Sequence, residues 1–186
     1  GLGDVYKRQE FADGIEQIGK FAFYANRNLT RLYLPSSLKT IGEQAFRSCT
    51  GLLSVLLPST LENVGAHAFY RCTQLTVYSD AQSVPESWDT RWNSSFRPVM
   101  LGCTLSEDGS YVVSVTINES LMLNVERLSE SGDSAPVLGN NRFSSPSRRG
   151  YNFSGWTTQA DGTTPELTGS DIADLPEGTT LYTVWE

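Results

Sequence analysis

The chain repeats one six-residue phrase three times, as Ile18-Gly19-Lys20-Phe21-Ala22-Phe23, Ile41-Gly42-Glu43-Gln44-Ala45-Phe46 and Val64-Gly65-Ala66-His67-Ala68-Phe69. The copies start 23 residues apart, and the leucines, prolines and cysteines between them keep nearly the same step. A fixed period of about 20 to 50 residues indicates a solenoid, because one repeat cannot bury its own apolar face and has to stack on its neighbours. The sequence therefore predicts a stack of similar turns.

Each unit combines a short strand with a tight turn. Apolar residues alternate over 30–34 and 53–57, and the proline that follows each segment ends the strand because proline cannot donate to a ladder. The glycine of each phrase marks a turn where a side chain would be unwelcome. The phenylalanine that closes each phrase is expected to pack as a large buried plug between layers. These three rings, of Phe23, Phe46 and Phe69, should form one stacked column.

The unit resembles the BspA-type leucine-rich repeat, whose consensus runs Leu-x-x-Ile-x-Ile-Pro-x-x-Val-x-x-Ile-Gly-x-x-Ala-Phe-x-x-Cys. The resemblance covers about residues 11–80 as repeats and reaches about residue 100 with the cap. It implies a solenoid with a parallel strand ladder, a bacterial surface location, and a role in adhesion or protein recognition. The third strand, over 75–80, lacks the proline, so either Tyr78 or Val77 can take its inward position.

Residues 81–100 break the period, as the end of a repeat array requires. Trp88 and Trp92 are four residues apart and can cover the open end of the stack from one side. Two exposed tryptophans would instead form a platform for stacking sugars, and we favour the lid.

The charge balance excludes several partner classes. The 14 Lys and Arg residues face 21 Asp and Glu, which gives a net charge of −7, whereas nucleic-acid binding needs a basic surface. The same charge disfavours an anionic membrane face, and the chain has no apolar run of about 18 residues that could span a bilayer. We therefore expect no nucleic acid and no membrane insertion in this segment.

From residue 101 the pattern changes to that of a β-rich unit. Ser106-Glu107-Asp108-Gly109-Ser110 predicts a hairpin with a type I′ turn, and residues 111–117 alternate as a β-branched strand. Residues 129–149, rich in Ser, Gly, Pro and Asn, predict a long surface connection.

The last segment carries Pro146-Ser147-Arg148-Arg149-Gly150-Tyr151-Asn152-Phe153-Ser154-Gly155-Trp156 and ends on Leu181-Tyr182-Thr183-Val184-Trp185. It resembles the internalin-type B-repeat, which implies a small β-grasp-like domain. Tyr151 and Phe153 are expected on one strand face, with Trp156 and Trp185 in the core; an aromatic recognition patch is the alternative.

No reactive constellation is visible. The one histidine, His67, occupies a variable position of the repeat, and no nucleophile-elbow, P-loop or dinucleotide-binding motif occurs. The three cysteines do not have zinc spacing. Cys49 and Cys72 occupy equivalent positions about 5 Å apart, which allows a disulfide or two small buried side chains. Asp108 and Asp161, each beside a glycine, fit turn geometry better than calcium binding. We expect no cofactor, no metal and no enzymatic activity.

The outward side chains of the predicted ladder are the candidate binding surface. Strand alternation turns Arg31 and Tyr33 outward in one unit, and Ser54 and Leu56 outward in the next. A stacked sheet presents such side chains at fixed spacing, and Tyr and Arg are enriched among recognition anchors. An ordinary solvated face is the competing interpretation.

We expect a β-rich α+β chain, with residues 1–9 as a non-native leader, a capped leucine-rich-repeat solenoid over 10–100, and a B-repeat-like domain over 101–186. The leader does not fit the repeat and resembles a translated adapter from sequence assembly. The expected function is non-catalytic adhesion or protein recognition at a bacterial cell surface, with a protein or host-matrix ligand. The alternative is an accessory, spacer or substrate-binding region of a larger secreted hydrolase. Under either interpretation we expect this chain to be a fragment of a longer protein.

Overall fold

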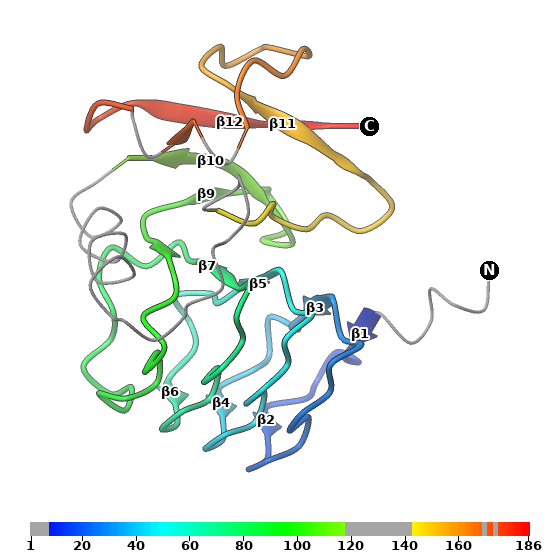
Figure 1. Cartoon of the computed structure of the whole chain (residues 1–186), viewed down its shortest axis with the longest axis vertical. Coiled ribbons are helices and arrows are strands. Elements are labelled where there is room, and N and C mark those ends of the chain that lie inside the picture. Colours follow the sequence, from blue (N-terminus) through cyan, green and yellow to red (C-terminus); the bar gives the residue numbers. More distant parts are fainter. Residues whose placement is uncertain (1–7, 118–142, 169–170, 173–174) are drawn as a thin grey trace.

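A computed structural model describes residues 8–117, 143–168, 171–172 and 175–186. Within these residues the chain consists of strands, turns and loops with almost no helix. A solenoid of stacked turns is followed by an antiparallel sheet that lies along one side of it (Figure 1). The predicted fold class, a β-rich solenoid with a parallel ladder and then a second β unit, is confirmed.

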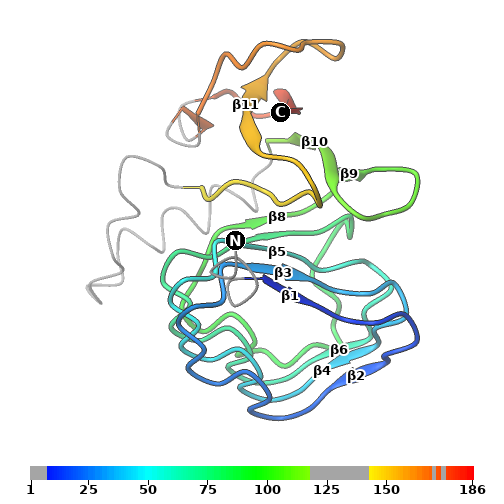
Figure 2. The same cartoon turned by 90° about the vertical axis from the view of Figure 1, so that its right-hand side faces the viewer.

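Two parallel ladders run along the solenoid. The longer one has the order β1 (Arg8–Glu10), β3 (Arg31–Tyr33), β5 (Ser54–Leu56), β7 (Thr76–Tyr78) and β8 (Val99–Met100). The shorter one has β2 (Gln17–Ile18), β4 (Thr40–Ile41) and β6 (Asn63–Val64). Figure 2 shows the successive turns lying over one another, with the two ladders on opposite sides of each turn.

The first strand begins inside the segment that we expected to be a leader. Arg8 and Gln9 pair with Arg31 and Leu32 in the parallel register of β1 and β3. A non-native leader over residues 1–9 stays a prediction, because this pairing does not test its origin and residues 1–7 lie outside the described part. Ladder pairing uses backbone groups, so a segment that lacks the repeat's side chains can still add a strand.

The predicted phenylalanine column is confirmed. The rings of Phe23 and Phe46 are 5.2 Å apart at an angle of 5°, and those of Phe46 and Phe69 are 5.5 Å apart at 4°. Phe46 and Phe69 are fully buried, whereas Phe23 is half-buried near the start of the array. Apolar burial at this one position in every unit gives the solenoid a continuous core.

The structure resolves the register of the third strand. Val55 pairs with Val77 and Leu56 pairs with Tyr78, so this unit is one residue shorter than the one before it. Val77 takes the inward position, and Tyr78 points outward. A shift of one residue exchanges the two faces of a strand. Without the proline, the sequence alone therefore left open whether Val77 or Tyr78 points inward.

The two tryptophans form the lid. Trp88 and Trp92 are buried, and their rings meet edge to face at 5.1 Å. Trp92 contacts Phe69, the last ring of the column, at 6.5 Å, while Trp88 donates to the carbonyl of Leu61. Because both rings are buried, the sugar-platform alternative is wrong.

The second unit is a four-stranded antiparallel sheet. Its order is β11 (Phe153–Thr157), β12 (Thr180–Trp185), β10 (Val112–Thr116) and β9 (Thr104–Leu105). The predicted hairpin and strand near 106–117 are therefore present. The turn is not type I′, because Gly109 has a positive φ of 69° but Asp108 does not, and type I′ requires both.

The aromatic core of this unit differs in part from the prediction. Trp156 is buried as expected, but Trp185 is only half-buried and packs on Phe153 at 5.3 Å. Tyr151 lies before β11 and is 44% exposed, so it does not share a strand face with Phe153. The expected connection over 129–149 falls outside the described residues up to 142.

The two units share strands β7 and β8. Val77 and Val99 point into the solenoid core, whereas Tyr78 and Met100 belong to the core of the antiparallel unit. Leu56 of β5 also packs against that second core. The second unit is thus built on the outward face of the ladder, and a domain boundary near residue 101 stays a prediction.

Candidate binding groove

The four predicted surface residues lie on the outward face of the long ladder, but their surroundings differ. Arg31 and Tyr33 on β3 are half-exposed, Ser54 on β5 is 2% exposed, and Leu56 is half-buried. The expectation that all four face solvent is therefore corrected at Ser54.

Residues 143–147 lie across the ladder and explain this burial. The hydroxyls of Ser54 and Ser147 are 2.9 Å apart. The backbone N–H of Ser144 donates to the hydroxyl of Thr76 at 2.9 Å, and the carbonyl of Ser144 accepts from the hydroxyl of Tyr78 at 2.5 Å. The ladder thus binds the incoming segment over β5 and β7 through side-chain hydroxyls.

A pattern in the outward positions could have predicted this cover. A solvated sheet face carries mainly polar residues, but the row that starts with Glu10 and Tyr33 continues with Leu56, Tyr78 and Met100. Apolar residues on the outward face of successive strands indicate a second layer.

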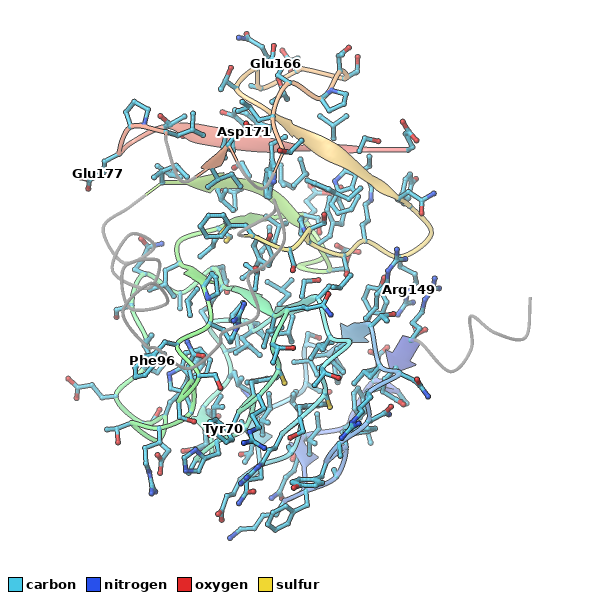
Figure 3. All side chains as sticks on the ribbon, viewed as in Figure 1. Tyr70, Phe96, Arg149, Glu166, Asp171 and Glu177 are labelled. Atoms are coloured by element: carbon cyan, nitrogen blue, oxygen red, sulfur yellow. The ribbon has the colours of Figure 1, made fainter. Side chains whose placement is uncertain are left out.

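Beside the covered strip lies a groove of about 590 Å³. We call it the binding groove. The ladder residues Tyr33 and Leu56 line it, together with the hairpin loop at 108–111 and the turn at 146–151. Figure 3 shows Arg149 of that turn between the antiparallel sheet and β1. Ser54 also lines the groove, whereas Arg31 is outside its lining.

Two adjacent arginines bring positive charge to the groove. The guanidinium carbon of Arg148 lies 4.1 Å from the ring centre of Tyr111 and 3.8 Å from that of Tyr151. Arg149 forms an ion pair with Glu10 and lies 5.9 Å from the ring of Tyr33. Stacking on aromatic rings orients a guanidinium plane and leaves its edge available for hydrogen bonds.

Two of the carboxylates in the lining are already hydrogen-bonded. Asp108 accepts from the hydroxyls of Ser106 and Ser110 and from the N–H of Ser110, and these bonds lower its pKa to about 2. Asp80 accepts from the N–H and the hydroxyl of Ser59 at 2.6 and 2.9 Å. Both carboxylates therefore hold loops in place, and at Asp108 this is the turn role expected from the sequence.

The described residues contain no reactive arrangement in this groove. His67 lies elsewhere, beside the lid, where its Nδ1 is 2.7 Å from the hydroxyl of Ser94. The nearby carboxylate of Asp89 binds Arg91 at 3.3 Å instead of orienting the imidazole. Within the described residues no three His, Cys, Asp or Glu side chains are grouped as metal ligands.

The three cysteines are free, buried thiols, so no disulfide joins Cys49 and Cys72 in this structure. The thiols of Cys49 and Cys72 donate to the carbonyls of Phe23 and Phe46 at 3.1 and 3.0 Å. Burial raises the pKa of Cys72 well above its usual value, and that of Cys103 to about 12. Cys72 and Cys103 are therefore structural thiols, whereas a hydrogen bond with Cys72 lowers the pKa of Cys49.

In the part of the chain that the structure describes, no helix has the length and apolarity needed to cross a membrane.

Comparison with known families identifies the first unit. Residues 6–89 match the profile described as BspA type Leucine rich repeat region, in six copies. This segment therefore consists of BspA-type leucine-rich repeats, as the resemblance predicted. The B-repeat resemblance of the second unit has no counterpart in this match and stays a prediction.

A solved structure of a leucine rich repeat protein from T. pallidum is similar in sequence to part of the chain. The two are 33% identical with a TM-score of 0.35, and the match covers 44% of this chain and 37% of that one. The match therefore spans well under half the length of that protein. A comparison with curated proteins found no match.

Proposed function

We propose that this chain is a non-catalytic, extracellular recognition region that binds a protein partner at a bacterial cell surface. BspA-type repeats point to protein–protein recognition or surface adhesion. The observation that carries the proposal is the binding groove, where the outward face of the repeats meets two loops of the second unit.

The composition of the groove suits recognition. Its volume of about 590 Å³ falls within the usual range for ligand sites, roughly 300–1,000 Å³. Tyr33, Tyr111 and Tyr151 provide aromatic surface with few rotatable bonds, and Arg148 provides directional hydrogen bonds. Tyr and Arg are among the residues that dominate the binding energy of protein interfaces.

The four residues predicted from the sequence take different parts in this proposal. Tyr33 and Leu56 form part of the floor of the groove, while Ser54 acts indirectly by holding Ser147. Arg31 lies in the neighbouring row, where it pairs with Arg8 of β1, and extends the surface beyond the groove. The ladder forms the floor of the groove, and the loops at 108–111 and 146–151 form its walls. Such a groove encloses more of a ligand than a flat ladder of short strands can.

Selection of ligands from a displayed random-peptide library on the whole chain tests the proposal. Tyr33→Ala and Tyr151→Ala are expected to weaken binding of the selected peptides by about 1 kcal/mol or more each, as for interface anchors. Tyr24→Ala is the matched control, because Tyr24 is 49% exposed and does not line the groove. The folded state of each variant is checked by its thermal unfolding.

Two results would contradict the proposal. Selected peptides that bind both groove variants as well as the unmodified chain would remove the site from the groove. If no groove-dependent peptide is selected and the chain instead binds neutral oligosaccharides, the alternative of a substrate-binding region of a secreted hydrolase would be favoured.

A further inference from the structure

We propose that Arg148 is the anchor of the binding groove and that it receives one carboxylate of a partner peptide. The partner segment would carry an Asp or Glu side chain next to apolar or aromatic residues. This inference rests on the proposed protein-recognition function and names the chemistry of the partner.

The surroundings of Arg148 fix the orientation of its charge. Its guanidinium lies between the rings of Tyr111 and Tyr151, at 4.1 and 3.8 Å, and the ring of Trp185 is 6.0 Å away. Rings on two sides restrict how the guanidinium plane can turn, which lowers the ordering cost of a bound carboxylate. A planar guanidinium can then donate two parallel hydrogen bonds to the two carboxylate oxygens.

Of the two arginines in the groove lining, Arg148 has no ion-pair partner among the described residues. Arg149 is paired with Glu10, Asp108 is bound by two serines, and Asp80 is bound by Ser59. No described carboxylate lies within ion-pair distance of Arg148. An arginine held between rings at the wall of a groove, without an acidic partner there, is complementary to a carboxylate on a ligand.

The rest of the lining favours a ligand with one acidic group. Asp13, Asp80 and Asp108 are carboxylates of the lining, so a run of acidic residues would meet repulsion there. Tyr33, Leu56 and Leu105 line the same groove and favour apolar or aromatic neighbours of the acidic residue. We therefore favour a peptide with a single acid between apolar residues over a polyanion.

A pair of synthetic peptides tests this inference directly. The probe is acetylated and amidated Ser-Phe-Glu-Phe-Ser, and its partner carries Gln in place of Glu. Isothermal titration calorimetry with the whole chain should show the Glu peptide binding about tenfold more tightly, since hydrogen bonds to charged groups are the stronger ones. The difference should shrink as salt concentration rises.

Two substitutions separate anchoring from a structural role. Arg148→Gln should abolish the preference for Glu over Gln, and Arg148→Lys should keep only part of it, because an ammonium lacks the planar pair of donors. Arg27→Gln is the control, since Arg27 is exposed and outside the groove lining. If Arg148→Gln lowers the unfolding temperature, its Glu-to-Gln affinity ratio is compared below that temperature.

The outcomes distinguish this inference from the function on which it rests. Equal binding of the Glu and Gln peptides, or an unchanged preference in Arg148→Gln, would overturn the anchor. Peptides selected from a random library would still support the recognition groove if they depended on Tyr33 and Tyr151. A failure of those peptides as well would remove both proposals.

Discussion

Three equivalent glycines show how position in the array changes the role of one residue. A Cβ atom added at Gly42 would lie 2.6 Å from the backbone nitrogen of Lys20, and one at Gly65 would lie 2.5 Å from that of Glu43. At Gly19 nothing lies within 4 Å of the added atom. The glycine is therefore required where a preceding turn packs against it, and this close approach, not an unusual φ, is the reason.

Gly42→Ala should destabilise the protein by about 1–3 kcal/mol, because backbone of the preceding turn has to move away. Gly19→Ala is the matched control and should change the free energy of unfolding by less than about 0.5 kcal/mol. Urea denaturation of both variants gives the comparison. Equal effects at the two positions would show that the turns do not approach each other as described.

The loop carboxylate Asp108 gives a prediction for acid conditions. Its pKa is lowered from 3.8 to about 2 by hydrogen bonds from Ser106 and Ser110, so the ionised form is favoured in the folded state. The resulting stabilisation of the hairpin loop is present above about pH 4 and declines as the pH falls toward 2. An NMR titration of the Asp108 carboxyl carbon measures this, and Ser106→Ala should raise the pKa. An unchanged pKa in that variant would remove Ser106 as the cause.

At the level of the elements, the phenylalanine column and its lid join the repeats into one core. Each ring contacts the ring of the next unit, and Trp92 closes the column at Phe69. Such a stack depends most on its middle members, since they have neighbours on both sides.

Phe46→Ala should therefore cost about 3–5 kcal/mol, as for other large core aromatics. Phe21→Ala is the control, because Phe21 is outside the column and is 51% exposed. It should change the free energy of unfolding by no more than about 0.5 kcal/mol. Thermal unfolding followed by circular dichroism compares the two. A small loss at Phe46 would mean that the column contributes little to stability.

At the level of the whole molecule, the shared strands β7 and β8 link the two units. A chain that ends at Leu101 would keep the solenoid core but expose Leu56, Tyr78 and Met100 on its outward face. We expect this shortened chain to self-associate and to bind a hydrophobic dye, because adjoining apolar side chains become exposed. Size-exclusion chromatography checks this.

The double substitution Leu56→Ser and Met100→Ser in the shortened chain is expected to restore a monomer. A shortened chain that is monomeric without these changes would show that the two units are independent domains.

The period predicted the solenoid, its parallel ladder and the phenylalanine column, because side chains at one position repeat in space. It did not predict the burial of Ser54, which depends on a segment more than 90 residues later in the chain, at Ser147. The groove is not predictable for the same reason: Tyr33 belongs to the ladder, but Tyr111 and Arg148 join it only through tertiary packing. The apolar row on the outward face indicates a second layer, but local patterns do not identify which distant segment supplies it.

The central claim, that a partner binds in the groove, is tested most directly by NMR of ring-labelled tyrosines with a selected peptide. We predict that the signals of Tyr33, Tyr111 and Tyr151 shift on binding, whereas those of Tyr24 and Tyr70 do not. Tyr70 lies low on the solenoid, away from the antiparallel sheet (Figure 3). Shifts at Tyr24 and Tyr70 with unchanged groove signals would contradict the claim.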